Sequence, residues 1–511
     1  MDAARPRAEA VAVEGERILA VGSGGDARAH VGLRTEVIDC GDRAVLPGFI
    51  DGHCHLLAYA ASLLSVDCSP AAVSSIGDIQ AAIRQRAEGT PTGRWVRAVG
   101  YSEVDLAEER HPTRWDLDAA APNNPVRLIH RSGHACVLNS LALRLCGIDI
   151  TTEEPPGGYL DRDISSGEPT GLLLEMNEVV ERVVPPLSYE ELAQGVRLAS
   201  QRFLAAGVTS LVDATHTNGP LEWELMGRLR REGHLAPRVT AMTGIDHLED
   251  ARYFSRRLTR LGRGRSDDED EWVSLGAAKI VIKELGAEIY PAEAEVTALV
   301  AEAHGRGWQV AIHAVEEPAV AAAVAAFEAA LRGRPLGHHR HRIEHCGLCP
   351  PELVRRIAAV GLLVVTQPSF LHYNGERYLR QVPPEKQVHL YPLRSLARAG
   401  VRLAAGSDCP VVAPDVMAGL YGAVARRSAG GRPLPGDETV AIEEALAMYT
   451  TGAAFSAFAE GERGSIVPGR LADLVVLSGD PTDCSPAELL ALRPEMTVVG
   501  GRLAWPSVKE W

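Results

Sequence analysis

The sequence predicts an α/β protein built on a (β/α)8 TIM barrel, with a small β-sandwich and an inserted α+β subdomain. Short apolar stretches alternate with helical segments rich in Ala, Glu, Leu and Arg along most of the chain. Eight such strands are present, and several end in histidine or aspartate, which together indicate a TIM barrel. The expected strands are the stretch before His53, then Gly207–Asp213, Arg238–Thr243, Leu275–Lys283, Trp308–His313, Arg342–Cys346, Leu362–Thr366 and Val401–Ser407.

The two ends of the chain, residues 1–46 and 464–511, are expected to form the sandwich together. Ala10–Val13 and Arg17–Gly22 flank a Gly turn and predict a hairpin, which Glu36–Cys40 would extend. The segment from residue 464 to 505 is equally rich in short apolar strands. Neither end is long enough to close a core alone, so we expect them to pack against each other.

Residues 61–189 interrupt the strand–helix alternation of the barrel, which covers 47–60 and 190–463. They contain an amphipathic helix at Ile76–Ala87, strands at Trp95–Gly100 and Val126–His130, and a helical stretch at Asn139–Leu145. We therefore expect an inserted subdomain over the barrel mouth. Asp267–Glu271, a run of acidic residues, is expected to be a solvated loop.

Composition excludes several classes of protein. The chain has 511 residues, 46% hydrophobic and 23% charged, which is ordinary for a globular protein with a large core. A formal net charge of −15 argues against nucleic-acid binding, and no apolar stretch is long enough to span a membrane. Nine scattered cysteines and an N-terminus without an apolar signal core indicate a cytoplasmic protein with reduced thiols. The expected partner is a small-molecule substrate, and a homodimer is left open.

Two histidines end the stretch Pro47–Leu56. His53 and His55 lie two residues apart, so a strand places both side chains on one face, where they can reach one metal ion. Such a pair is weak evidence alone, but His313, His345 and Asp408 also follow strands. Because the carboxyl ends of barrel strands carry the chemistry, these five residues predict a site for a divalent cation such as zinc.

With these residues in place, the chain resembles the amidohydrolase superfamily, and within it the amidohydrolase-3 group that includes N-substituted formamide deformylases. The resemblance implies a metal-dependent hydrolase of a non-peptide C–N bond, with an amide or an N-formyl or N-acyl amine as substrate. Metal-activated hydroxide would attack, with Asp408 as general base and acid. Lys279 would be an N6-carboxylated lysine that bridges two ions. One or two Zn2+ ions are expected, with Mn2+ or Fe2+ as alternatives.

Other interpretations stay open at this stage. Lys279 could be an ordinary lysine that points to solvent or pairs with an acid, leaving a single metal. Asp408 could cap the helix that follows Ser407. A deaminase, or a lyase or isomerase that does not hydrolyse, could use the same scaffold. A non-catalytic binding protein is a further alternative, although such proteins usually lose their metal ligands.

Four more residues are candidates for substrate binding, and one of them for catalysis. His134 could donate to a developing oxyanion or be a structural histidine, and Arg131 could bind an anion. Glu175 matches an acidic position that recurs in the group, which implies a role in lining the site. Lys283 stands where relatives usually carry Asp, so it could bind an anionic group or pair with Glu284 or Glu288.

Three further histidines, His338, His339 and His341, precede the sixth barrel strand in a polar loop. The polar neighbours indicate surface residues.

Overall fold

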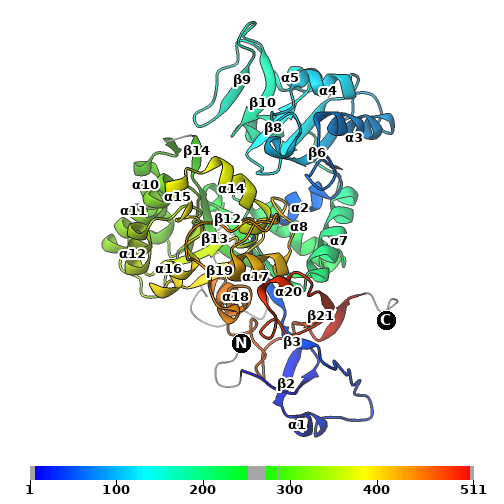
Figure 1. The fold of residues 1–511 in the computed structure, drawn as a ribbon, viewed down its shortest axis with the longest axis vertical. Helices are drawn as coiled ribbons and strands as arrows, with labels where there is room; N and C mark the ends of the chain where they lie inside the picture. The colour runs from blue at the N-terminus through cyan, green and yellow to red at the C-terminus, as the bar shows by residue number, and fades with distance from the viewer. Residues whose placement is uncertain (1–5, 251–271, 286–287, 507–511) are drawn as a thin grey trace. The chain divides into compact units, whose positions relative to one another are not determined.

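The computed structural model describes residues 6–250, 272–285 and 288–506 (Figure 1). The acidic run Asp267–Glu271 lies outside these residues. The chain divides into two compact units, one of which consists of Leu56–Ala199 and Lys283–Pro291 and is called the inserted unit below. The remaining residues form the barrel unit.

The predicted TIM barrel is confirmed, because eight strands form one parallel sheet in the order β19-β18-β17-β16-β13-β12-β11-β4. The two end strands approach each other at their carboxyl ends, where Asp408 N donates to His53 O (2.7 Å) and His55 N donates to Cys409 O (2.9 Å). The barrel strands are β4 (Phe49–Cys54), β11 (Val208–Asp213), β12 (Arg238–Gly244), β13 (Val273–Val281), β16 (Val310–Ala314), β17 (Arg342–His345), β18 (Leu363–Thr366) and β19 (Leu403–Ala405).

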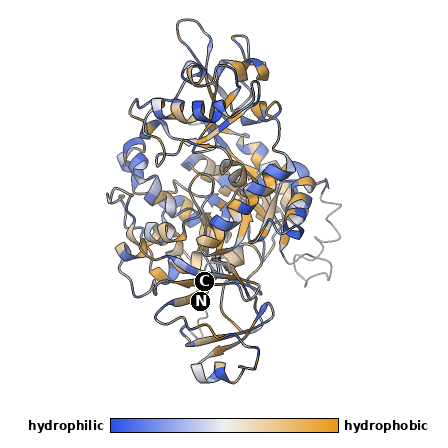
Figure 2. Ribbon diagram, turned by 90° about the vertical axis from the view of Figure 1, so that its right-hand side faces the viewer, coloured by the Kyte–Doolittle hydropathy of each residue, from blue (hydrophilic) through white to orange (hydrophobic). Residues whose placement is uncertain are grey.

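These strands have almost continuous apolar sequences because both faces of the sheet are buried. Every residue of β4, β11 and β12 is buried, as in parallel sheets covered by helices. Helices cover the sheet, and hydrophilic and hydrophobic stretches alternate along many of them (Figure 2). They are α8 (Pro220–Arg231), α10 (Glu293–Gly305), α11 (Glu317–Gly333), α12 (Pro351–Val360), α13 (Ser369–Tyr373), α14 (Gly375–Gln381), α15 (Pro384–Gln387), α16 (Leu393–Arg398), α17 (Val416–Ala425), α18 (Ile442–Met448) and α19 (Thr451–Ser456). Among the described helices, none combines the length and the apolar character that crossing a membrane requires.

Strands from both ends of the chain lie together in the barrel unit (Figure 1). The hairpin of β1 (Ala10–Glu14) and β2 (Arg17–Gly22) bonds to the C-terminal segment, where Ile18 N donates to Arg470 O (2.8 Å). A four-stranded antiparallel sheet has the order β22-β21-β20-β3, with β3 (Ala44–Pro47) from the N-terminal segment. Its other strands are β20 (Leu474–Leu477), β21 (Pro494–Val499) and β22 (Arg502–Trp505), with the short helices α1 (Gly24–Arg28) and α20 (Pro486–Leu489) nearby in sequence.

The predicted strand at Glu36–Cys40 is wrong. The segment has no regular structure, and its apolar side chains Val37 and Ile38 are 72% and 49% exposed. Asp39 Oδ1 instead accepts a hydrogen bond from Gly41 N and turns the chain toward β3.

The inserted unit has a mixed six-stranded sheet in the order β5-β6-β7-β8-β10-β9. Asn139 joins sheet to helix, because its side-chain oxygen accepts from Val126 N in β7 and from Ala142 N in the first turn of α5. A short hairpin, β14 (Lys283–Leu285) with β15 (Glu288–Tyr290), belongs to the same unit. The other elements are β5 (Val66–Asp67), β6 (Val96–Tyr101), β7 (Val126–His130), β8 (Ala135–Leu138), β9 (Tyr159–Arg162), β10 (Pro169–Leu174), α2 (Leu56–Ser62), α3 (Ile76–Glu88), α4 (Arg114–Ala120), α5 (Ser140–Cys146) and α6 (Asn177–Glu181), while α7 (Tyr189–Ala205) runs from this unit into the barrel unit.

Candidate metal centre

The barrel brings together the six residues predicted to hold metal, at the carboxyl ends of its strands. We call them the carboxyl-end cluster: His53 and His55 at the end of β4, Lys279 in β13, His313 in β16, His345 at the end of β17, and Asp408 after β19. One ligand atom each from His53, His345 and Asp408 lies within 4.8 Å of the other two. His55 Nε2 is 3.1 Å from Asp408 Oδ1, and His313 Nδ1 is 2.9 Å from His345 Nε2.

Two hydrogen-bond acceptors face each other in this cluster. His53 Nδ1–H donates to the carboxylate of Glu344 (2.5 Å), which leaves the lone pair of His53 on Nε2. In the neutral ring this atom is an acceptor; it is buried, has no hydrogen-bond partner among the described residues, and lies 3.3 Å from Asp408 Oδ1, which is also an acceptor. Two lone pairs that face each other repel, and a cation between them would attract both. These ligand atoms therefore fit a divalent metal ion.

Asp408 is ionised in this setting. Burial alone would raise its pKa, but hydrogen bonds from His53 and His55, and the positive charge that a protonated His53 ring carries, hold the pKa of this carboxyl well below its usual range. The helix-capping alternative is wrong, since the Asp408 side chain contacts the two histidines and the next helix, α17, is capped by Asp415.

Lys279 is buried beneath the histidines, only 2% exposed, so the solvent-pointing alternative is wrong. Within the described part of the chain its Nζ makes no hydrogen bond. Burial lowers the pKa of this ammonium to about 8, against the opposing charges of Glu344 and Asp408. A buried amine without a hydrogen-bond partner among the described residues destabilises the fold, so its place beside the candidate ligands indicates a role in the site.

Backbone strain gathers at the same strand ends. His345 (φ 71°), Cys346 (φ 53°) and Asp408 (φ 57°) adopt the left-handed conformation that side chains other than glycine avoid. Such strain persists where the surroundings enforce it and is concentrated at functional sites. Nearby, a Cβ on Gly406 would lie 2.4 Å from His53 N, so only glycine allows the two end strands to approach this closely.

Several supporting residues were missed in the sequence. Gln367 Oε1 accepts from His345 Nδ1 (2.8 Å), and Thr215 Oγ1 lies 3.0 Å from His55 Nδ1. Asp51 accepts from His53 N, Ser407 N and Ser407 Oγ, and burial raises its pKa to about 6. Gln367 and Thr215 lie far from the histidines in sequence, and no local pattern pairs them; Asp51 lies two residues before His53 on β4, so the two-residue repeat of a strand could have indicated it.

Glu344 was also missed, although a signal for it exists. Arg342 and Glu344 are two residues apart on β17, so they share a face of the strand, and both are buried. A buried Arg-x-Glu pair on a barrel strand indicates an internal ion pair. The charge of Arg342, together with His53, outweighs the effect of burial and holds the pKa of Glu344 below its usual range.

The four predicted substrate-binding residues all lie in the inserted unit. His134 Nδ1 is 2.7 Å from Glu175 Oε1, so these two side chains form a pair. Arg131 Nη1 lies 3.7 Å from Asp105 Oδ2, and Lys283 Nζ lies 3.3 Å from Glu178 Oε1 rather than beside Glu284 or Glu288. Their roles in substrate binding, and that of His134 in catalysis, stay predictions.

The expectation of three surface histidines before β17 is right only for His338, which is exposed. His341 is fully buried and His339 is partly buried. With His304 they form a second group, which we call the amino-end histidines. Residues distant in sequence explain why His341 is buried. Val310 N donates to His341 Nδ1 (3.0 Å), His341 Nε2 lies 2.9 Å from His304 Nδ1, and the ring of Phe327 stacks on His341.

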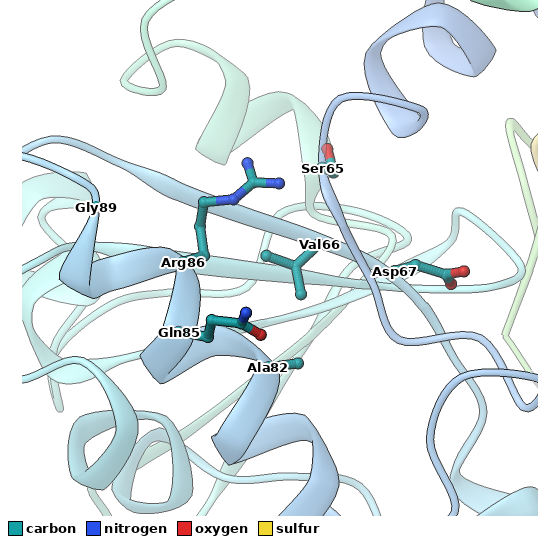
Figure 3. A pocket seen from close by; sticks show the side chains of 7 residues that line it. All are labelled: Ser65, Val66, Asp67, Ala82, Gln85, Arg86 and Gly89. Atoms are coloured by element: carbon teal, nitrogen blue, oxygen red, sulfur yellow. The ribbon is translucent and has the colours of Figure 1, made fainter.

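A cavity of about 490 Å³ lies in the inserted unit between β5 and α3 (Figure 3). None of the predicted site residues lines it. Its lining residues are Ser65, Val66, Asp67, Ala82, Gln85, Arg86 and Gly89.

Known proteins resemble this chain over almost its whole length. A profile of the amidohydrolase family matches residues 36–504. An N-substituted formamide deformylase of Arthrobacter pascens is 33% identical over 99% of this chain and 96% of its own, and the putative amidohydrolase YtcJ of Bacillus subtilis is 28% identical over 98% and 96%.

The fold has a counterpart among solved structures. An uncharacterized metal-dependent hydrolase from Pyrococcus furiosus has a TM-score of 0.69 and 25% identity, covering 93% of this chain and 95% of that one. The likeness therefore extends beyond the barrel to most of the chain.

Proposed function

The chain belongs to the amidohydrolase family, and on that basis we propose that it is a metal-dependent hydrolase of a non-peptide C–N bond, with an N-substituted formamide or another N-acyl amine as substrate. The observation that carries the proposal is the pair of facing acceptors, His53 Nε2 and Asp408 Oδ1, 3.3 Å apart. The formamide deformylase relative supports the substrate class.

The residues that would hold metal are the carboxyl-end cluster. His53, His55 and Asp408 would bind one ion, and His313 and His345 would bind a second or share the first. A bound divalent ion such as zinc lowers the pKa of water to about 7 and polarises the carbonyl oxygen under attack. Zinc suits the nitrogen-rich ligand set, with Mn2+ or Fe2+ as alternatives.

Asp408 would move the proton. Its carboxylate is ionised, so one oxygen can accept a proton from the attacking water. The same oxygen can then deliver that proton to the nitrogen of the leaving amine, which departs as a neutral molecule. His55, in contact with Asp408 Oδ1, orients the carboxylate for both transfers.

Lys279 would supply the bridging anion. Its buried amine has no hydrogen-bond partner in the described residues and has a lowered pKa, so a neutral fraction is available to attack CO2. The amine nitrogen forms a bond to the carbon, one C=O π bond of CO2 breaks, and the nitrogen loses a proton, which gives a carbamate with one negative charge shared by its two oxygens. That carboxylate would sit between two cations, whereas an ammonium would repel them.

The test combines metal analysis with product analysis. Protein purified without added metal and protein loaded with Zn2+ or Mn2+ should be incubated with N-substituted formamides, N-acyl amines and cyclic amides. We expect formate or another carboxylic acid and an amine in equal amounts, measured by NMR, from at least one class.

Asp408→Asn is the matched control, because it keeps the shape of the side chain and removes the base. Metal-loaded protein that releases no acid and amine from any of the three classes contradicts the proposal. Ammonia release from an amino heterocycle would identify a deaminase instead.

A further inference from the structure

Glu344 contacts both the candidate metal centre and a buried cation. It is fully buried in β17, 0% exposed. Its Oε2 accepts from His53 Nδ1–H (2.5 Å) and from Arg342 Nη2 (2.9 Å), while Oε1 accepts from Arg342 Nε (2.5 Å). Among the described residues, every hydrogen bond to this carboxylate therefore comes from His53 or Arg342.

This arrangement fixes the tautomer of His53. A neutral imidazole carries one proton, and a carboxylate cannot donate, so the proton stays on Nδ1. In the neutral ring the lone pair of His53 is then on Nε2, the atom that faces Asp408. Carboxylates in this position are known to orient histidine ligands and to increase their basicity.

Arg342 ties the carboxylate to the barrel wall. Its Nη2 also donates to Gly52 O (2.8 Å), the residue before His53, and its Nη1 donates to Ser456 Oγ (3.3 Å) in α19. The guanidinium thus holds Glu344 and the backbone of β4 in one frame. The ring of His53 is fixed at both its Nδ1 and its backbone, and little freedom is left to lose when a metal binds.

We propose that Glu344 is a positioning residue, which with Arg342 presents His53 as an Nε2 ligand to the metal. The inference rests on the proposed function, because it concerns metal bound by the same cluster. It assigns a role to an ion pair that a barrel does not need for folding, since buried pairs are often replaceable by apolar residues.

Glu344→Gln tests this role. Arg342 donates to both carboxylate oxygens, so either orientation of the glutamine amide sets an N–H group against a donor. When the amide nitrogen faces His53, Nδ1 must accept and the proton moves to Nε2, the metal-binding atom. We expect the affinity for Zn2+, measured by competition with a chelator, to fall about 10- to 100-fold.

Asp473→Asn is the matched control. Asp473 forms an equally buried ion pair with Arg238 Nε (2.8 Å), at the amino end of β12 and among none of the predicted metal ligands. Glu344→Gln and Asp473→Asn each remove the negative charge that faces a buried arginine, so both variants should be less stable than the wild type. Only Glu344→Gln should weaken Zn2+ binding and change the visible absorption spectrum of the Co2+-loaded protein.

A double variant provides a second test in case Glu344→Gln does not fold. Arg342→Met with Glu344→Leu removes both buried charges at similar volume, which should preserve the fold, yet it leaves His53 Nδ1 without its carboxylate. We expect the same weakened Zn2+ binding.

The outcomes separate the two proposals. Wild-type protein that binds no Zn2+ or Co2+ contradicts the proposed function. Wild-type protein that binds Zn2+, together with a folded Glu344→Gln or double variant of equal affinity, overturns the positioning role alone.

Discussion

Two groups of histidines lie at opposite ends of the barrel strands. They differ in whether protein atoms satisfy the hydrogen-bonding capacity of every side chain. In the amino-end histidines every ring nitrogen has a protein partner. His304 Nε2 donates to Arg334 O (2.7 Å), His339 Nε2 lies 3.2 Å from Val360 O, and His341 is bonded on both sides. Donors and acceptors alternate along this chain, so it is complete with neutral rings.

In the carboxyl-end cluster the donors and acceptors are not matched in this way. His53 Nε2 and Asp408 Oδ1 are two acceptors that face each other, and Lys279 Nζ makes no hydrogen bond within the described residues. Both groups are buried and rich in histidine, so neither property separates them. The difference is the pair of facing acceptors in the carboxyl-end cluster, which is the reason we propose it as a ligand set and interpret the amino-end histidines as a structural network.

The largest expected effect comes from removing charge at the carboxyl end. Asp408→Asn should lower the rate of amide hydrolysis about 10²- to 10⁴-fold, because the amide cannot take up the proton from water. Initial rates with a saturating formamide measure this. Full activity in Asp408→Asn would remove Asp408 from the proton transfer and weaken the contrast between the two groups.

Lys279 gives the next test, since it is the one cation inside the carboxyl-end cluster. If it carries a carboxylate, the mass of the intact protein under native conditions should exceed the sequence mass by one CO2. Lys279→Ala should then lose activity, and acetate should restore part of it by filling the vacated space. An unmodified lysine beside two fully occupied metal sites would contradict the bridging role.

Substitution of an amino-end histidine should lower the stability of the protein and leave its metal content unchanged. His341→Leu leaves Val310 N and His304 Nδ1 without partners, which should lower the free energy of unfolding by about 2–4 kcal/mol. Urea unfolding measures the change, and metal content is the control. Loss of bound metal from folded His341→Leu would show that the two groups are not independent.

The last prediction is a dependence of stability on pH, which is small near neutral pH and grows as the pH falls. Burial, with the neighbouring His339 and His304, lowers the pKa of His341 from its ordinary 6.5 to about 2. Below pH 6.5 the unfolded chain therefore takes up a proton that the folded chain does not. The stabilisation is complete above that pH and is lost toward pH 2, at about 1.4 kcal/mol per pH unit for one group.

Comparison with His341→Leu isolates this contribution. The stability of the wild type should fall more steeply between pH 6 and pH 4 than that of the variant. Equal slopes would mean that His341 is already protonated in the folded protein.

Local periodicity was enough to predict the barrel and the strand ends at which the candidate ligands gather. The eight strands follow from apolar runs between helical segments, and His53 with His55 follows from the two-residue repeat of a strand. Partnerships across the barrel could not be predicted. Glu344 lies 291 residues from His53 in the chain, and nothing near either residue encodes their contact.

The errors have the same origin. His341 stands in a polar loop but is buried by Phe327 and His304 from other elements. Val37 and Ile38 look like strand residues, yet no neighbouring strand pairs with them in the described structure. Lys283 begins a hairpin in the inserted unit, where it pairs with Glu178, although alternation would place it inside the barrel.

The most direct test of the contrast is a metal count per chain on three proteins purified in parallel without added metal. They are the wild type, the double variant His53→Ala/His55→Ala, and His341→Leu. We predict one or two divalent ions per chain in the wild type and in folded His341→Leu, and none in the double variant, whose circular dichroism spectrum should be unchanged. Metal retained at the wild-type ratio in His53→Ala/His55→Ala would contradict the assignment of the carboxyl-end cluster as the metal centre.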